Sequence, residues 1–107
     1  MSKCKKKENL IILIVSLLDR RFLIANAQLE HWPIIFCNDA FCDLIGYSRA
    51  DILQKSCTCQ FLYGDETSEK AIKQIQQIID SSEEKEVDLA LYKSNGMTIN
   101  EMKIFVF

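Results

Sequence analysis

Short apolar runs and strict alternation predict four strands in two separate parts of the chain. Residues 22–27 (FLIANA) and 34–37 (IIFC) are bounded by turn-forming residues, and Pro33 can begin the second run because its missing N–H is tolerated there. In residues 87–92 (VDLALY) every second position is strongly apolar, which indicates a half-buried strand. Asn95-Gly96 then predicts a type I′ hairpin turn, in which both central residues have positive φ, with residues 97–107 as the returning strand.

Between these pairs of strands the apolar period changes to that of helices. A short helix is expected to begin at Asn38 or Asp39 and to end at Gly46, and a second is expected to begin at Ser48. A longer helix is predicted for residues 68–79, followed by a solvated linker at residues 80–85. The apolar face of the first helix is formed by Phe41, Leu44 and Ile45, and that of the long helix by Ala71, Ile72, Ile75, Ile78 and Ile79.

The N-terminal segment, residues 1–21, has a different pattern. A basic cluster at residues 3–7 (KCKKK) precedes the apolar run at residues 10–18 (LIILIVSLL). The run is much shorter than the roughly 20 residues needed to span a bilayer. It imitates the start of a secretory signal, but charged residues 19–21 interrupt it and the A-x-A site lies within the strand predicted at residues 22–27. An interfacial helix or a packing segment is expected, and the pattern does not choose between them.

Composition and charge narrow the possible function. A chain of 107 residues with 49% apolar and 26% charged residues is one domain of ordinary globular composition. Its net charge of −2 argues against a general nucleic-acid binder. The five cysteines are scattered, which predicts free, buried thiols in a reducing compartment. His31 is the only histidine, and Asp39 and Asp43 are explained by capping and solvent exposure, so no catalytic residues and no metal site are predicted.

The order strand, strand, short helices, long helix and hairpin is an α+β layout, an antiparallel sheet with helices on one face. Residues 22–96 resemble the N-terminal PAS domain of ether-à-go-go-type voltage-gated potassium channels. The residues that carry the resemblance are Asn38-Asp39, Phe41-Cys42, Gly46-Tyr47-Ser48-Arg49-Ala50, Cys57-Thr58-Cys59 and Phe61-Leu62. The resemblance implies a non-enzymatic regulatory domain at the cytoplasmic face of the plasma membrane.

The resemblance also implies a partner. In that family the PAS domain docks on the channel's C-terminal cyclic-nucleotide-binding homology domain and modulates gating, especially deactivation. The matching positions for an interaction patch are Phe22, Phe36 and Arg49, of which Arg49 is expected to form a salt bridge. From the residues alone, a place in the core is favoured for both phenylalanines, because an isolated apolar residue carries little information about a surface role.

Two ligand-binding alternatives start from the same stretch. A PAS sensor could hold a small apolar ligand between the long helix and the sheet, and the expected lining is Phe41, Leu44, Ile45, Cys59, Phe61, Ile75 and Leu91. The stretch also resembles light-oxygen-voltage photosensors, with Cys59 at the position that forms the flavin adduct. Thr58, Gln60, Tyr63 and Leu91 replace the polar residues that would hold the flavin, so no cofactor is expected.

The resemblance implies five strands, with the last in the middle of the sheet, and that strand is not recognisable before Phe107. We therefore expect residues 22–107 to form an incomplete PAS domain, with a gap of unpaired backbone groups between two strand pairs. Such a domain is expected to be a fragment that does not fold stably alone, with residues 1–21 outside it. In an alternative arrangement, residues 10–15 fill the vacant position.

Overall fold

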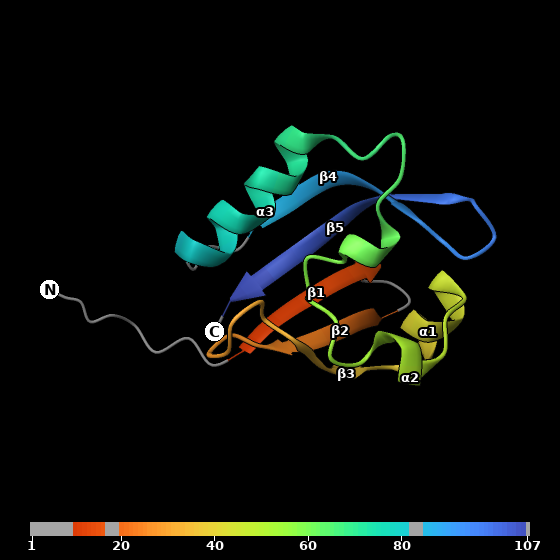
Figure 1. The fold of residues 1–107 in the computed structure, drawn as a ribbon, viewed down its shortest axis with the longest axis horizontal. Coiled ribbons are helices and arrows are strands. Elements are labelled where there is room, and N and C mark those ends of the chain that lie inside the picture. The colour runs from red at the N-terminus through yellow and green to blue at the C-terminus, as the bar shows by residue number, and fades with distance from the viewer. Residues whose placement is uncertain (1–9, 17–19, 82–84, 107) are drawn as a thin grey trace, which may run out of the picture.

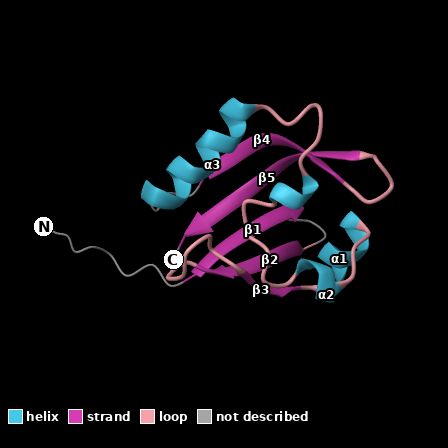
Figure 2. Cartoon of the chain, viewed as in Figure 1, coloured by secondary structure: helices cyan, strands magenta, loops and turns pink. Residues whose placement is uncertain are grey.

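A computed structural model describes residues 10–16, 20–81 and 85–106. Its five strands are β1 (Leu10–Ser16), β2 (Arg21–Asn26), β3 (Ile34–Cys37), β4 (Lys85–Tyr92) and β5 (Thr98–Val106). They form one antiparallel sheet in the order β3-β2-β1-β5-β4. The helices lie against one face of this sheet, which confirms the predicted α+β fold (Figures 1 and 2). No helix in the described part of the chain is long and apolar enough to span a membrane.

The central position of the sheet is occupied by β1, which pairs with β2 on one side and β5 on the other. Leu13 lies opposite Leu23 of β2 and Ile104 of β5, and all three side chains are buried. The expected gap is therefore wrong, and the alternative in which residues 10–15 fill the position is confirmed. Of the two roles left open for the apolar run, residues 10–16 take that of a packing segment and not that of an interfacial helix. The physical reason is backbone pairing, because β2 and β5 would each keep a row of unpaired polar groups without β1.

The helices follow the predicted caps. In α1 (Asp39–Ile45) the Asn38 side chain accepts a hydrogen bond from the Phe41 N–H at 3.0 Å, and Gly46 ends the helix with φ 80°. In α2 (Arg49–Ile52) the Ser48 hydroxyl accepts from the Asp51 N–H at 3.2 Å. A 3₁₀ helix, η1 (Gln60–Leu62), and the long helix α3 (Glu69–Ser81) complete the layer. Side-chain oxygens of Asn38, Ser48 and Ser68 thus fix where α1, α2 and α3 begin.

The β4–β5 hairpin is present, but its turn differs from the prediction. Only Gly96 has positive φ, at 88°, whereas a type I′ turn requires it of Asn95 as well. The Gly96 N–H donates to the Lys93 carbonyl at 2.9 Å, and the Lys93 N–H donates to Met97 at 2.7 Å. This is a three-residue loop that ends in a left-handed glycine, the next most common hairpin connection.

The core lies between the helices and the sheet. Its buried apolar residues come from all five strands and from α1, α2, η1 and α3. The expected core face of α3 is largely confirmed, since Ala71, Ile75, Ile78 and Ile79 are buried and Ile72 is half-buried. Part of the linker expected at residues 80–85, and the basic cluster at residues 3–7, lie outside the described residues.

Candidate docking surface

The face of the sheet opposite the helices carries a row of apolar side chains. Directly opposite positions of neighbouring strands point to the same side of a sheet. The register places Phe105 opposite Ile12, Ile12 opposite Ile24, and Ile24 opposite Phe36, so the row crosses β5, β1, β2 and β3. Phe36 is 45% exposed and the other three are half-buried. These four residues, with Phe22, are called the outer apolar row below.

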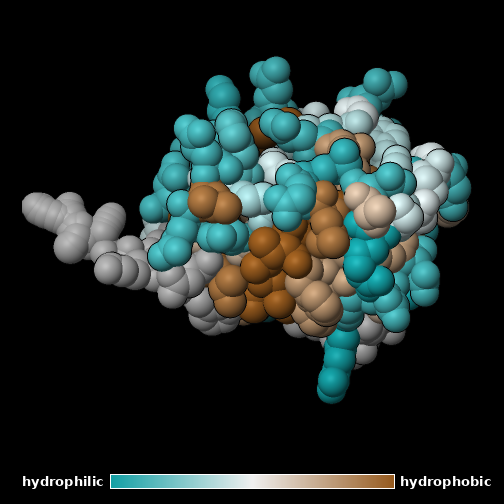
Figure 3. All heavy atoms as spheres, turned by 60° about the horizontal axis from the view of Figure 1, so that its bottom comes forward, coloured by the Kyte–Doolittle hydropathy of each residue, from teal (hydrophilic) through white to brown (hydrophobic). Residues whose placement is uncertain are grey.

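Phe22 joins this row through its ring. The centroids of Phe22 and Phe36 lie 6.0 Å apart with an interplanar angle of 37°, a favourable tilted arrangement. Asn38 links the end of β3 to the start of β2 at Phe22. The Asn38 Oδ1 accepts from the Phe22 backbone N–H, and the Asn38 backbone N–H donates to the Phe22 carbonyl, both at 3.2 Å. Its side-chain amide also donates to the Arg20 carbonyl. Figure 3 shows apolar residues gathered in one continuous area on the side of the molecule where β3 lies.

Arg49, the first residue of α2, contacts the end of β3, where Cys37 directly follows Phe36 in the chain. Its guanidinium donates to the Cys37 carbonyl from Nε at 3.2 Å and from one terminal nitrogen at 3.1 Å. The same terminal nitrogen contacts a carboxylate oxygen of Asp39 at 2.5 Å, and this hydrogen bond is the main cause that raises the pKa of Arg49. Both partners of this ion pair are exposed, so it adds little stability. Arg49 is thus already engaged within the chain and positions the end of β3.

The seven expected lining residues are divided between the core and the surface. Five of them are at most 1% exposed and pack in the core cluster, namely Phe41, Ile45, Cys59, Ile75 and Leu91. Leu44 and Phe61 are half-buried. The Phe61 ring meets Tyr47 edge-on at 5.7 Å and lies beneath the Lys55 ammonium at 5.5 Å. The structure gives these residues a packing role between the helices and the sheet.

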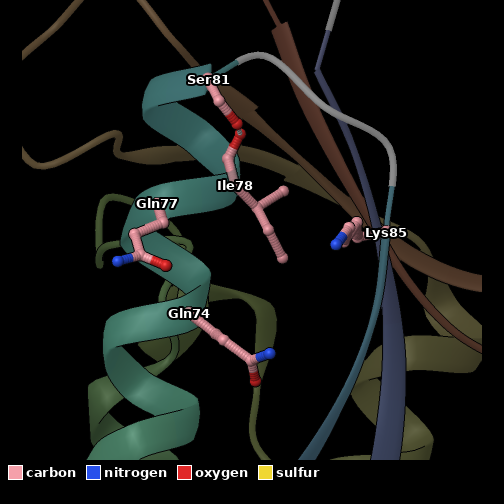
Figure 4. Close-up of a pocket in the computed structure, with 5 residues that line it drawn as sticks. All are labelled: Gln74, Gln77, Ile78, Ser81 and Lys85. Atoms are coloured by element: carbon pink, nitrogen blue, oxygen red, sulfur yellow. Dashed lines mark hydrogen bonds between the residues drawn. The ribbon is translucent and has the colours of Figure 1, made fainter.

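The described part of the chain has two surface hollows, of about 250 and 240 Å³, and of the seven expected residues only Phe61 lines one of them. The first, shown in Figure 4, is lined by Gln74, Gln77, Ile78, Ser81 and Lys85. Lys85 reaches from β4 toward α3, and the Ser81 hydroxyl donates to the Ile78 carbonyl at 3.2 Å. The second is lined by Lys55, Ser56, Gln60 and Phe61. Sequence reasoning missed the first hollow, because Gln74 and Gln77 look like ordinary solvent-facing helix positions.

The cysteines of the Cys57-Thr58-Cys59 loop are protonated packing groups. Both side chains have no exposed area, and burial raises the pKa of Cys57 to about 12 and that of Cys59 further still. The Cys59 thiol donates to the Cys57 carbonyl at 3.4 Å. Because the thiolate is the reactive form, these thiols are chemically inert in the folded chain. The prediction of buried free thiols is confirmed here, and Cys4 lies outside the described residues.

Comparison with known proteins identifies the fold family. The sequence pattern of the PAS domain matches residues 19–107. The chain belongs to the PAS domain family. This PAS domain has a solved counterpart in the PAS domain from the fruit-fly ELK potassium channel, with a TM-score of 0.66 and 29% identity over 92% of this chain and 85% of that one. The family match begins after β1, so the central strand comes from outside the matched region.

Its curated relatives are potassium channels. The PAS domain is 48% identical over 77 residues to the voltage-gated inwardly rectifying potassium channel KCNH2 of pig, which is 72% of this chain and 7% of that protein. It is also 48% identical over 80 residues to KCNH7 of mouse and 47% identical over 77 residues to KCNH6 of rat. The chain thus spans under a tenth of the length of these relatives.

Light-sensing proteins share the architecture. The LOV domain of the blue-light-activated histidine kinase of Erythrobacter litoralis matches with a TM-score of 0.62 at 19% identity, over 96% of both chains. At that identity the likeness concerns the fold alone. The resemblance noted from the sequence is therefore confirmed at the level of the channel PAS domains, and the photosensor match adds only the shared sheet and helix layout.

Proposed function

We propose that this PAS domain is a regulatory module of a voltage-gated potassium channel. It docks through the outer apolar row on the channel's C-terminal cyclic-nucleotide-binding homology domain and slows deactivation. The support is the 48% identity to KCNH2 and the fold shared with the ELK channel PAS domain. On this proposal the domain lies at the cytoplasmic face of the plasma membrane, as part of the channel tetramer. It acts by binding a neighbouring domain, and no catalytic step is involved.

The exposed Phe36 ring is the observation that carries the proposal. Fully burying a phenylalanine side chain contributes about 1.5–3 kcal/mol, and Phe36 still exposes 45% of its surface. Covering the remainder on docking therefore contributes about 1 kcal/mol from this side chain alone. Phe22 and the half-buried members of the row enlarge the same apolar centre. An apolar centre within a polar rim is the usual composition of a specific protein interface.

Arg49 has a supporting place in this proposal. Its contacts with the Cys37 carbonyl and Asp39 hold the strand end that presents Phe36. We expect Arg49→Gln to weaken docking by loosening β3. Because Arg49 is also exposed at the edge of the row, a carboxylate of the partner can share its guanidinium, which offers several donors in one plane.

A binding measurement tests the proposal. The 107-residue chain is titrated into the purified cyclic-nucleotide-binding homology domain of a KCNH2 relative, with heat as the readout. We expect Phe36→Ser to weaken binding by about five- to tenfold, which corresponds to the loss of roughly 1–1.4 kcal/mol. Met97→Ser is the matched control, because Met97 is 61% exposed in the β4–β5 turn, away from the row. Equal affinities for the two variants would contradict the proposal.

Gating provides the second test. In a full-length channel that carries this sequence as its PAS domain, Phe36→Ser is expected to speed deactivation of the tail current, whereas Met97→Ser leaves it unchanged. Deactivation that is insensitive to Phe36→Ser, in channels that reach the membrane in normal number, would show that the outer apolar row does not regulate gating.

A further inference from the structure

Two thiols meet where β3 passes into α1. Cys37 is the last residue of β3, Cys42 lies in the middle of α1, and their sulfur atoms are 3.5 Å apart. The connection between them is fixed by the Asn38 cap, whose side chain holds the Phe41 N–H. The Cys37 carbonyl is in turn held by Arg49. Hydrogen bonds from Asn38 and Arg49 thus hold the backbone next to both cysteines and keep the two sulfur atoms close.

The two thiols differ in how easily a solute can reach them. Cys42 is partly exposed, whereas Cys37, Cys57 and Cys59 have no exposed area. The pKa of Cys37 is raised to about 11, mainly by burial and also by its contact with Cys42, while Arg49 opposes this shift. Oxidation of protein thiols follows exposure and thiolate character. Among the cysteines that the structure describes, Cys42 is therefore the one that an oxidant meets first.

We propose that Cys37 and Cys42 form an oxidation site that hydrogen peroxide converts from two thiols to an intramolecular disulfide. The Cys42 thiol releases its proton, and the resulting thiolate attacks one oxygen of the peroxide. The O–O bond breaks, Cys42 becomes a sulfenic acid, and the departing hydroxide takes up the released proton to form one water. The Cys37 sulfur then attacks the Cys42 sulfur, and the hydroxyl leaves with the Cys37 proton as a second water. Two thiols lose two electrons and two protons in total, and the peroxide is reduced to two waters.

The geometry favours this outcome over further oxidation of Cys42. A disulfide needs the sulfurs at about 2.05 Å, so from their separation of 3.5 Å they must approach by roughly 1.5 Å. A sulfenic acid with a thiol in contact condenses to a disulfide instead of accumulating. Cys57 and Cys59 lie in a separate buried loop and have no comparable access to solvent. The pair is consequently a two-electron redox site in which the oxidant reacts first at the partly exposed Cys42.

Closing the disulfide joins the end of β3 to α1 directly after Phe36. The bond would add a covalent link to a junction that is otherwise held by Asn38 and Arg49. The oxidation chemistry does not depend on the proposed docking function, because it rests only on the two sulfurs and their exposure. If the docking proposal holds, the oxidation state of this pair sets the rigidity of one edge of the outer apolar row.

Tryptic mapping tests the proposal, because cleavage after Arg21, Arg49, Lys55 and Lys70 separates the two cysteine pairs. The peptide of residues 22–49 contains only Cys37 and Cys42, and that of residues 56–70 contains only Cys57 and Cys59. The reduced full chain, with Cys4→Ser in every variant, is treated with equimolar hydrogen peroxide, alkylated in denaturant and digested. We expect peptide 22–49 to become lighter by two hydrogen atoms and to lose both alkylation sites, while peptide 56–70 stays fully alkylated.

Two variants complete the design. Cys42→Ser should abolish the change in peptide 22–49 and leave Cys37 reduced, whereas Cys57→Ala should leave the change intact. Reduction with dithiothreitol should restore both alkylation sites, and circular dichroism checks that each variant keeps its fold. The proposal is overturned if peptide 22–49 of the folded chain stays reduced, carries a sulfinic acid on Cys42 without a disulfide, or links two chains.

Discussion

Leu13→Ala probes the least expected feature of the fold, the N-terminal strand at the centre of the sheet. Leu13 is 1% exposed and lies opposite Leu23 and Ile104, so its side chain is enclosed by neighbours from two strands. Truncating a buried leucine removes its transfer free energy and leaves a cavity, which together cost about 2–5 kcal/mol. Since β2 and β5 on either side of Leu13 are fixed by backbone pairing with β1 and cannot collapse inward, we take about 3 kcal/mol as the expected loss.

This loss is large against the whole stability of a small domain, which is typically about 5–15 kcal/mol. Urea unfolding of a domain of this size has a slope of about 1.5 kcal/mol per molar, so the midpoint should fall by roughly 2 M. Trp32 fluorescence and circular dichroism report the transition. Ile12→Ala is the matched control, because Ile12 lies on the outer face of the same strand and is only half-buried. It should cost clearly less.

A second measurement on the unmodified chain addresses the same strand. The amides of residues 11–14 lie between β2 and β5 and should exchange with solvent as slowly as the most protected core amides. If Leu13→Ala costs less than about 1 kcal/mol, below the range for buried leucines, and residues 11–14 exchange rapidly, then β1 does not hold the centre of the sheet. The unpaired-backbone argument for its position would then be refuted.

Further predictions concern local strain and alkaline pH. Gly46→Ala should cost about 1–2 kcal/mol from its positive φ, plus the displacement of Ser94, whose hydroxyl oxygen would lie 2.1 Å from the new Cβ. Gly96→Ala, with φ 88° and no atom within 4 Å, should cost only the φ strain, and urea unfolding compares the two. Burial raises the pKa of Cys57 and of Tyr63 to about 12, above their ordinary values of 9.0 and 10.0. The folded chain therefore keeps protons that the unfolded chain loses, so the unfolding free energy should fall as pH rises from about 9 to 12. A flat profile over that range would contradict the burial of both groups. Tyr63→Phe should cost about 1 kcal/mol at neutral pH, because the Thr58 carbonyl loses a 2.7 Å hydrogen bond.

The local elements could be read from the sequence because their signals are local. Asn38, Gly46 and Ser48 cap or end helices through their own side chains or backbone freedom, so the boundaries of α1 and α2 were predictable. The apolar face of α3 follows from its period. The type of the β4–β5 turn could not be read in the same way, because Asn95-Gly96 is compatible with more than one loop length and cross-strand pairing decides among them.

The candidate site was predictable in part. Phe22 and Phe36 were singled out through the family resemblance, and the structure places their rings in contact on the outer face. Nothing in the sequence indicated that Ile12, Ile24 and Phe105 continue the row, because that depends on the register of four strands. The proximity of Cys37 and Cys42 was equally hidden, since five positions of separation across a strand-to-helix junction fix no distance between sulfur atoms.

The sequence by itself determined the caps, the helical faces and the family, because each depends on neighbouring residues or on a recognisable run of side chains. Only the tertiary structure decided what residues 10–15 do. A continuous apolar run has no polar position to reveal its period, so it is equally suited to a helix and to a strand covered on both faces. The strand is selected by β2 and β5, which are distant in the sequence. Their facing backbone N–H and C=O groups need hydrogen-bond partners, which a strand between them supplies and a helix does not.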